Sequence, residues 1–173
     1  MNKNYTLSAD CIFHCSGHFS KLCTSEKAKI EASGRTAAEI NAMLARPGSK
    51  FFAGSVAEVV EAILRNAVKT ENVDSKVVVH ATFRQPVGLT GILSDNELTD
   101  SMRAGIREDK RGPYTVRTVP CATMSPTREA HLVMDALTHS VITLFPGCYA
   151  PAIPSEGWSA SPFWSTHYFI RLK

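Results

Sequence analysis

The sequence contains no apolar run that approaches the ~18–20 residues needed to cross a bilayer. Residues 1–6 have no apolar segment of the kind found in a secretory signal. A glycine-rich phosphate loop, a nucleophile elbow and a zinc-protease motif are also missing. The acidic residues are scattered rather than paired, which disfavours a two-metal nuclease or a glycosidase. We therefore expect no membrane association and no catalytic metal.

A strong charge of either sign is missing as well. The 19 Lys and Arg exceed the 16 Asp and Glu by only three, less than is usual for a protein that coats a nucleic acid. An enzyme that handles nucleic acid briefly needs only a local basic cleft. At 173 residues with 44% hydrophobic side chains, the chain can bury a core without disulfides or metals. We expect one domain over residues 1–173.

Cysteines are few, and their number is odd. Without a signal peptide, the five thiols are expected to be reduced. Three of them lie with two imidazoles in a short N-terminal stretch: Cys11, His14, Cys15, His18 and Cys23. The stretch has no C-x2-C pair and no second half-site, so it fits no standard zinc motif. Small buried thiols are the expectation, and a zinc-stabilised binding protein is the alternative.

Two helices and several strands can be predicted from local signals. Thr36 with Glu39 and Ser55 with Glu58 have the capping-box spacing, and each pair precedes an apolar helical stripe, the second running to Val68. Strands are expected at 76–83, 114–119, 138–145 and 166–172, and a solvated helix or loop at 103–111. Helices first and strands later predict an α+β fold, with N-terminal helices packed on a mostly antiparallel sheet.

The residues left for chemistry are histidine, arginine, hydroxyl groups and thiols. This set suits metal-free acid–base catalysis with cationic stabilisation of an anion. Cleavage of RNA by transesterification needs such a set, because the substrate's own 2′-hydroxyl is the nucleophile. Histidine transfers protons near neutral pH, and the arginine fork matches the oxygens of a phosphate.

An ordered series of short motifs carries a family resemblance. The motifs are Gly17-His18, Ser33-Gly34-Arg35-Thr36, Phe51-Phe52-Ala53-Gly54-Ser55-Val56-Ala57-Glu58, Gln85-Pro86-Val87-Gly88 and Val141-Ile142-Thr143-Leu144-Phe145-Pro146. Their order and spacing resemble the bacterial ribonuclease A-like toxin domain at the C-termini of contact-dependent inhibition and other polymorphic toxins. The resemblance spans about residues 17 to 147, which leaves residues 148–173 as a C-terminal extension. It implies a pancreatic-ribonuclease-like fold without the disulfides.

The resemblance also implies site residues. His18 falls on the catalytic histidine, Arg35 on the cationic position before a helix, and Thr143 on the threonine that contacts the phosphate. Phe145 stands where the family has tyrosine, so it could stack on a base but could not transfer a proton. Between His18 and Arg35 the chain is longer than in the family and carries Lys21, a further candidate for binding the substrate.

A second proton-transfer group has to come from the other histidines. If residues 138–145 form one regular strand, residues 139, 141, 143 and 145 share a face, which would place His139 beside Thr143. We therefore expect His139 to be the second catalytic histidine. His80 and His167 are expected to be structural or at the surface, and His131 is given no role.

The sequence thus predicts a metal-independent endoribonuclease that leaves a 2′,3′-cyclic phosphate and needs no cofactor. The resemblance implies a toxin that acts in the cytoplasm of a target bacterial cell, with RNA as substrate, tRNA among the candidates, and a cognate immunity protein as partner. The main alternative is a catalytically inactive module of the same fold that binds RNA or a protein. It is favoured by the loss of tyrosine at Phe145.

Overall fold

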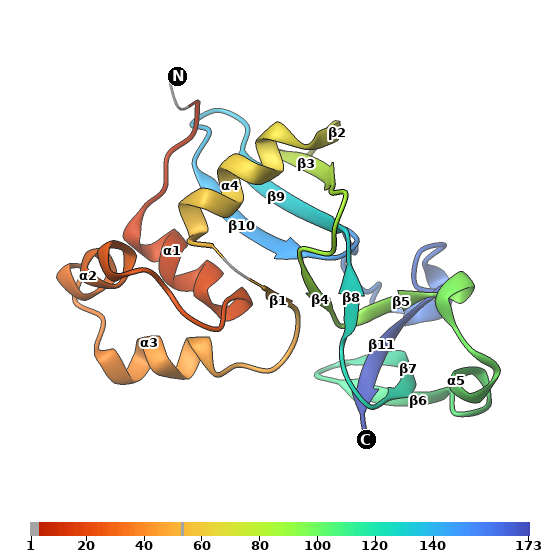
Figure 1. The fold of residues 1–173 in the computed structure, drawn as a ribbon. Coiled ribbons are helices and arrows are strands. Elements are labelled where there is room, and N and C mark those ends of the chain that lie inside the picture. Colours follow the sequence, from red (N-terminus) through yellow and green to blue (C-terminus); the bar gives the residue numbers. More distant parts are fainter. Residues whose placement is uncertain (1–3, 53) are drawn as a thin grey trace. The chain divides into compact units, whose positions relative to one another are not determined.

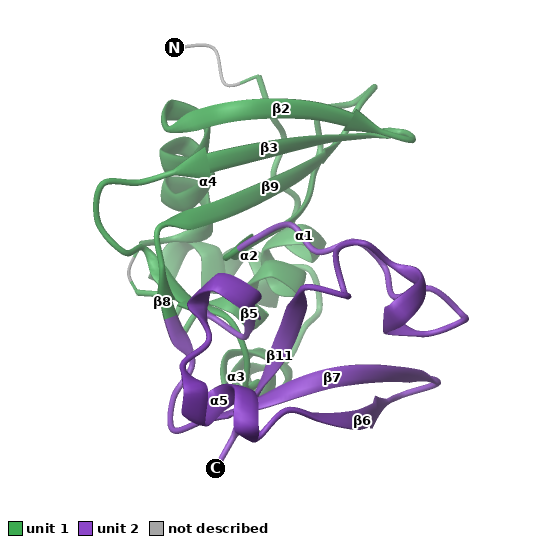
Figure 2. Cartoon of the chain, turned by 90° about the vertical axis from the view of Figure 1, so that its right-hand side faces the viewer, with its two compact units in different colours: residues 1–89, 126–147 green, residues 90–125, 148–173 purple. Residues whose placement is uncertain are grey.

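The computed structural model describes residues 4–52 and 54–173, and it is an α+β protein with several antiparallel sheets (Figure 1). Its chain divides into two compact units (Figure 2). Unit 1 holds residues 1–89 and 126–147, and unit 2 holds residues 90–125 and 148–173. The expected division into a core at 17–147 and an extension at 148–173 differs from this one, because residues 90–125 belong with the C-terminal segment. Ala53, part of one motif, lies outside the described residues.

Unit 1 begins with the helical half of the chain. Its helical elements are α1 (Ala9–Cys15), the short 3-10 helix η1 (Ser16–His18), α2 (Thr24–Ala32), α3 (Ala37–Leu44) and α4 (Val56–Arg65). Both predicted capping boxes are confirmed: Thr36 caps α3 with Glu39, and Ser55 caps α4 with Glu58. Helix α4 ends at Arg65, earlier than expected. Val68, which was predicted to lie on its apolar face, is instead an exposed residue of the following strand.

A four-stranded antiparallel sheet, in the order β10-β9-β3-β2, forms the other half of unit 1. Its strands are β2 (Ala67–Val73), β3 (Lys76–Thr82), β9 (Glu129–Asp135) and β10 (Val141–Pro146). Helix α4 packs across this sheet and buries one side of itself against it (Figure 1). The buried side chains of α4 are Val56, Val59, Val60 and Ile63. Each such valine or isoleucine contributes about 1.5–3 kcal/mol of burial free energy.

A small three-stranded sheet, in the order β1-β4-β8, contains the points where the chain leaves unit 1 and returns to it. Its strands are β1 (Lys50–Phe51), β4 (Gly88–Thr90) and β8 (Ser125–Thr127). Phe51 of β1 pairs with Gly88 of β4. A Cβ on Gly88 would lie 2.9 Å from the Cβ of Pro146 and closer still to the Lys50 carbonyl oxygen. Glycine at position 88 therefore allows three segments of unit 1 to approach one another.

Unit 2 is a four-stranded sheet in the order β5-β11-β7-β6, with three short helical elements. These elements are β5 (Ile92–Ser94), η2 (Asp95–Glu97), α5 (Asp100–Ala104), β6 (Arg107–Arg111), β7 (Tyr114–Cys121), η3 (Trp158–Ala160) and β11 (His167–Leu172). Strand β11 is parallel to β7 and antiparallel to β5. The charged segment 103–111 was predicted as a helix or loop. That prediction is wrong for residues 107–111, which form β6.

The segment before β11 is fixed to the sheet of unit 2 by aromatic and arginine side chains. The Arg117 guanidinium lies between two rings, 4.0 Å from that of Trp158 and 4.3 Å from that of Tyr168. Trp164 is buried, and its indole N–H donates a hydrogen bond to the Pro151 carbonyl at 2.9 Å. Within the described part of the chain, no helix has both the length and the apolar character needed to span a membrane.

Candidate active site

His18 is the predicted site residue whose surroundings are best defined. It ends η1, directly after α1, and its side chain is half-buried. The Nδ1 atom lies 3.1 Å from the Ser49 carbonyl oxygen. A carbonyl can only accept, so Nδ1 carries the hydrogen and the lone pair of neutral His18 is on Nε2. The backbone thus selects the tautomer that leaves Nε2 able to accept a proton.

The electrostatic environment keeps His18 neutral. Burial is the main effect that lowers the pKa of His18, and nearby positive groups lower it further, while the hydrogen bond to Ser49 opposes them. The positive groups are His14, Arg46 and Lys50. At neutral pH, His18 is therefore a base in a cationic environment, and the same environment would attract a phosphodiester.

Lys50 holds the segment around His18 in place. Its ammonium group donates hydrogen bonds to the carbonyls of Gly17 at 2.8 Å, Phe19 at 3.2 Å and Leu44 at 2.9 Å. The first two flank His18 and the third ends α3, so one side chain joins η1 to α3. An ammonium has three N–H donors, and here all three are used by the backbone. Lys50 therefore positions His18 and is not free to bind a phosphate.

Phe145 of β10 lies between His18 and a second histidine. Its ring centroid is 6.1 Å from that of His18 and 5.6 Å from that of His131, on which it stacks with an interplanar angle of 23°. Leu144, the next residue back along β10, is fully buried in the core, so Phe145 and Thr143 both leave the strand on its other face. The structure therefore brings His18 and Phe145 together and places Thr143 on the same face as Phe145.

The second histidine belongs to a hydrogen-bonded pair that crosses the sheet. His131 of β9 is opposite both Phe145 and His80 in the strand pairing. Its Nδ1 lies 2.6 Å from the Gly147 carbonyl oxygen, and its Nε2 lies 2.7 Å from His80 Nδ1. Because the carbonyl accepts from Nδ1, His131 Nε2 must accept from His80 Nδ1–H when His131 is neutral. The lone pair of neutral His80 is then on Nε2, which is 3.6 Å from Glu71 Oε2.

The two members of this pair differ in burial. His131 is only 4% exposed, and burial lowers its pKa to about 4. Burial also lowers the pKa of His80, as does the charge of Lys69. Lys69 itself forms an ion pair with Glu71. His131 is thus neutral and links Gly147 to His80. His80 is the more exposed member of the pair and lies beside the Glu71 carboxylate and the Lys69 ammonium.

Two other predicted site residues, Arg35 and Lys21, have surroundings of their own. The Arg35 guanidinium pairs with Asp10 at 3.8 Å and Glu39 at 3.7 Å, and lies 4.5 Å from the Phe13 ring centre. Both carboxylates are beyond hydrogen-bond distance, and the Arg35 side chain is 41% exposed. Lys21 is exposed in the connection between η1 and α2.

The prediction that His139 shares a strand face with Thr143 is wrong. Residues 138–140 lie in the connection between β9 and β10, where His139 is exposed and has a φ of 54°. The register of β10 against β9 also shifts between Val141 and Thr143. This bulge inserts one residue, so Val141 lies in the core while Thr143 faces away from it.

Sequence reasoning missed His131 and His80, the histidines that complete the row beside Phe145. A local signal existed, because the sequence predicts a strand at residues 76–83, which includes His80. What was missing is the pairing of β3 with β9, which places His80 opposite His131 although 51 residues separate them. Register of this kind depends on the whole sheet.

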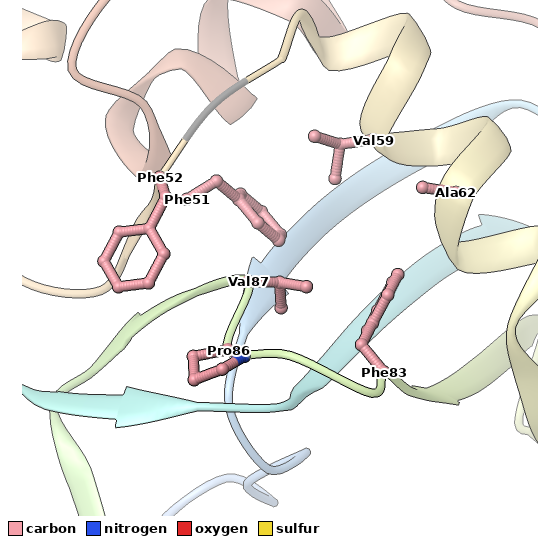
Figure 3. Close-up of a pocket in the computed structure, with 7 residues that line it drawn as sticks. All are labelled: Phe51, Phe52, Val59, Ala62, Phe83, Pro86 and Val87. Carbon is pink, nitrogen blue, oxygen red and sulfur yellow. The ribbon is translucent and has the colours of Figure 1, made fainter.

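An apolar pocket of about 230 Å³ lies elsewhere in unit 1, between α4 and the segments around β1 and β4 (Figure 3). Its lining residues are Phe51, Phe52, Val59, Ala62, Phe83, Pro86 and Val87. Phe51 is buried, whereas the Phe52 ring is 55% exposed. The pocket offers apolar contact but no titratable side chain, so it does not supply catalytic groups.

The thiols do not form a metal centre in the part of the chain that the structure describes. Cys11 and Cys15 are buried side by side in α1 with their sulfurs 3.7 Å apart, and Cys23 is exposed. Across residues 4–52 and 54–173, no group of three or more His, Cys, Asp or Glu side chains is arranged to hold a metal ion. All five cysteines are free thiols. No family model, no curated protein and no solved structure matches the chain.

Proposed function

We propose that the protein is a metal-independent endoribonuclease with His18 as its general base. The observation that carries the proposal is the state of His18: its Nδ1–H is bound to the Ser49 carbonyl, burial keeps the ring neutral, and Nε2 carries the lone pair. A neutral imidazole in a cationic environment is what a 2′-hydroxyl needs for activation next to a phosphodiester. The pancreatic-ribonuclease-like relationship is part of this proposal.

In the proposed reaction, His18 Nε2 accepts the proton of the 2′-hydroxyl as its oxygen attacks the adjacent phosphorus. The bond from phosphorus to the 5′-oxygen breaks, which leaves a 2′,3′-cyclic phosphate and a 5′-hydroxyl. The Thr143 hydroxyl donates a hydrogen bond to a non-bridging oxygen of the phosphorane. Arg46, whose charge acts on His18, takes the stabilising role that was expected of Arg35.

The leaving 5′-oxygen needs a proton. His139 lies in the β9–β10 turn, and His131 uses both ring nitrogens within the fold. His14 is exposed on the last turn of α1, four residues before His18, and close enough for its charge to lower the pKa of His18. We assign it the role of general acid. If the protein is a toxin, an immunity protein with an acidic face would cover His14 and Arg46.

The test is cleavage of total RNA in excess EDTA by the protein and by two variants. His18→Ala should abolish cleavage, whereas His139→Asn should leave it intact, because His139 is outside the proposed site and asparagine tolerates its positive φ. The products of the active proteins should carry 2′,3′-cyclic phosphate ends. Because the pKa of His18 is lowered, the acidic limb of the kcat/KM profile should lie below about 6.5, the ordinary histidine value.

Either of two results would reject this proposal. One is cleavage by His18→Ala at the rate of the unchanged protein. The other is the absence of cleavage by protein that circular dichroism shows to be folded, which would favour the inactive binding module. Phe145 supports that alternative, because its ring cannot donate the hydrogen bond of the tyrosine it replaces.

A further inference from the structure

One face of the unit 2 sheet carries arginines from two strands. Arg107 and Arg111 come from β6, and Arg171 comes from β11. Thr118 of β7 and Phe169 of β11 lie on the same face. Arg107, Thr118 and Phe169 form one cross-strand row. These residues line a cavity of about 250 Å³ together with Asp109 and Lys110. We call the residues that line this cavity the cationic face.

Asp109 forms ion pairs with two of the three arginines, Arg107 and Arg171, and leaves the face with a net positive charge. Its Oδ2 accepts a hydrogen bond from the Thr118 hydroxyl at 2.6 Å and one from Arg107 Nε at 3.0 Å. Arg171 Nη1 is 3.8 Å from the same oxygen, too far for a hydrogen bond. Among the described residues, this buried donor has no hydrogen-bond partner. One carboxylate thus shares this face with three guanidinium groups.

The aromatic residues of this face hold one guanidinium in place. Arg111 lies over the Phe169 ring, 4.1 Å from its centre, and the Phe169 ring stacks on Trp164 with centroids 4.6 Å apart. A guanidinium stacked in this way loses little further side-chain freedom when it binds an anion. Arg107 and Arg111 are four residues apart on one strand, so their Cα atoms are about 13 Å apart. The face therefore presents more than one cation, and stacking holds one of them, Arg111.

Protection of a sheet edge does not account for this arrangement. β6 is an edge strand, and charges of either sign on such a strand prevent pairing with other chains. Edge protection requires neither the stacking of Arg111 on Phe169 nor Arg171 on an interior strand. It also leaves unexplained a cavity lined by four cationic residues around one acid.

We propose that this face binds the phosphodiester backbone of single-stranded RNA and anchors the substrate of the endoribonuclease. The choice of RNA rests on the proposed function, whereas the anionic backbone follows from the guanidinium geometry. Binding is independent of sequence, because both faces of the Phe169 ring are already covered by Arg111 and Trp164 and no base can stack there.

The probe is a fluorescein-labelled 12-residue oligouridylate with 2′-O-methyl riboses, which cannot be cleaved by transesterification. Its affinity is measured by fluorescence anisotropy over a range of salt concentrations. Arg107→Gln with Arg111→Gln should weaken binding about tenfold or more. The slope of log affinity against log salt should fall by about 1.4, which corresponds to two lost phosphate contacts. The matched control is Arg65→Gln with Arg84→Gln, two exposed arginines of unit 1, and it should bind as the unchanged protein does.

A third variant should change the affinity for the probe in the opposite direction. Asp109→Asn keeps an acceptor for Thr118 but removes the negative charge that competes with a phosphate, so it should tighten binding about threefold or more. This variant also keeps the test decisive if the double arginine variant fails to fold. His18→Ala should bind the probe normally, so loss of cleavage and loss of anchoring are distinguishable.

Three outcomes would overturn the proposal. The first is binding by the folded double variant as tight as that of its control. The second is binding by Asp109→Asn no tighter than that of the unchanged protein. The third is competition by polyglutamate of the same length as effective as that by unlabelled oligonucleotide, which would show an anion surface that fits an acidic protein instead of a nucleic-acid site.

Discussion

Replacing His131 with glutamine should make unit 1 more resistant to acid. His131 is 4% exposed, is neutral in the folded protein, and has its pKa lowered by burial to about 4. Unfolded, it takes the ordinary histidine pKa of about 6.5. Between these two values the unfolded chain binds a proton that the folded chain does not, so stability falls as the pH falls.

The size of the effect follows from the two pKa values. The pKa of His131 is about 6.5 in the unfolded chain and about 4 in the folded protein. A histidine with these two values lowers the free energy of unfolding by about 2.5 kcal/mol when the pH falls from 7.5 to 4.5. Over the same pH interval, the His131→Gln variant should lose about 2.5 kcal/mol less stability than the unchanged protein. Its amide can donate to the Gly147 carbonyl and accept from His80, so the hydrogen bonds of His131 are kept.

The assay is urea unfolding of both proteins at the two pH values. Helices α1 to α4 belong to unit 1, so far-ultraviolet circular dichroism follows that unit. Both tryptophans, Trp158 and Trp164, lie in unit 2, so fluorescence reports the other unit as an internal control. The carboxylates that titrate below pH 5 are the same in both proteins and cancel in the difference. Equal losses of stability in the two proteins would refute the reasoning, because His131 would then not be a buried neutral group.

Two further substitutions test how the segments around His18 are joined. Lys50→Met removes three hydrogen bonds from an ammonium to backbone carbonyls and should lower the free energy of urea unfolding by about 3 kcal/mol. The control is Lys21→Met, at an exposed position, which should lower it by about 0.5 kcal/mol or less. Similar losses of stability in the two variants would contradict the anchoring role of Lys50. Gly88→Ala should lower stability by about 1–3 kcal/mol, because its Cβ would meet the Lys50 carbonyl and the Pro146 ring. The control in the same unfolding assay is Gly17→Ala, whose Cβ would lie 3.5 Å from the flexible end of Met43. Equal stability of the Gly88 and Gly17 variants would show that the segments around Gly88 can separate without cost.

The parts of the fold that sequence predicted are those fixed within a few residues. The capping boxes at Thr36 and Ser55 need only a hydroxyl and a glutamate three positions later, and both helices begin where expected. Strand β6 was missed because its five residues are all charged and show no apolar alternation. Its signal was the turn that follows, Gly112-Pro113, where Gly112 has a positive φ of 62° and the chain reverses into β7.

The candidate site was predictable only in part, because it depends on register. His18 and Phe145 were singled out from a motif series, and the structure brings their rings together. His139 was assigned from strand parity, which one bulge in β10 invalidates. His131 and His80 meet through the pairing of β3 with β9, and no local pattern shows that two strands so far apart in sequence are neighbours. The ion pair between Arg35 and Asp10 could not be foreseen either, because the two residues are 25 positions apart in the sequence.

The place of β11 in unit 2 has a consequence for a shortened chain. The sheet order puts β11 between β5 and β7, so its two neighbours are joined through it. A chain cut after Gly147 would keep every segment of unit 1, including the one that contains His18. It would lose residues 167–172, and β5 and β7 would then each have an edge with no partner strand. Removal of one terminal segment would therefore leave the residues around His18 in place and divide the sheet that carries the cationic face.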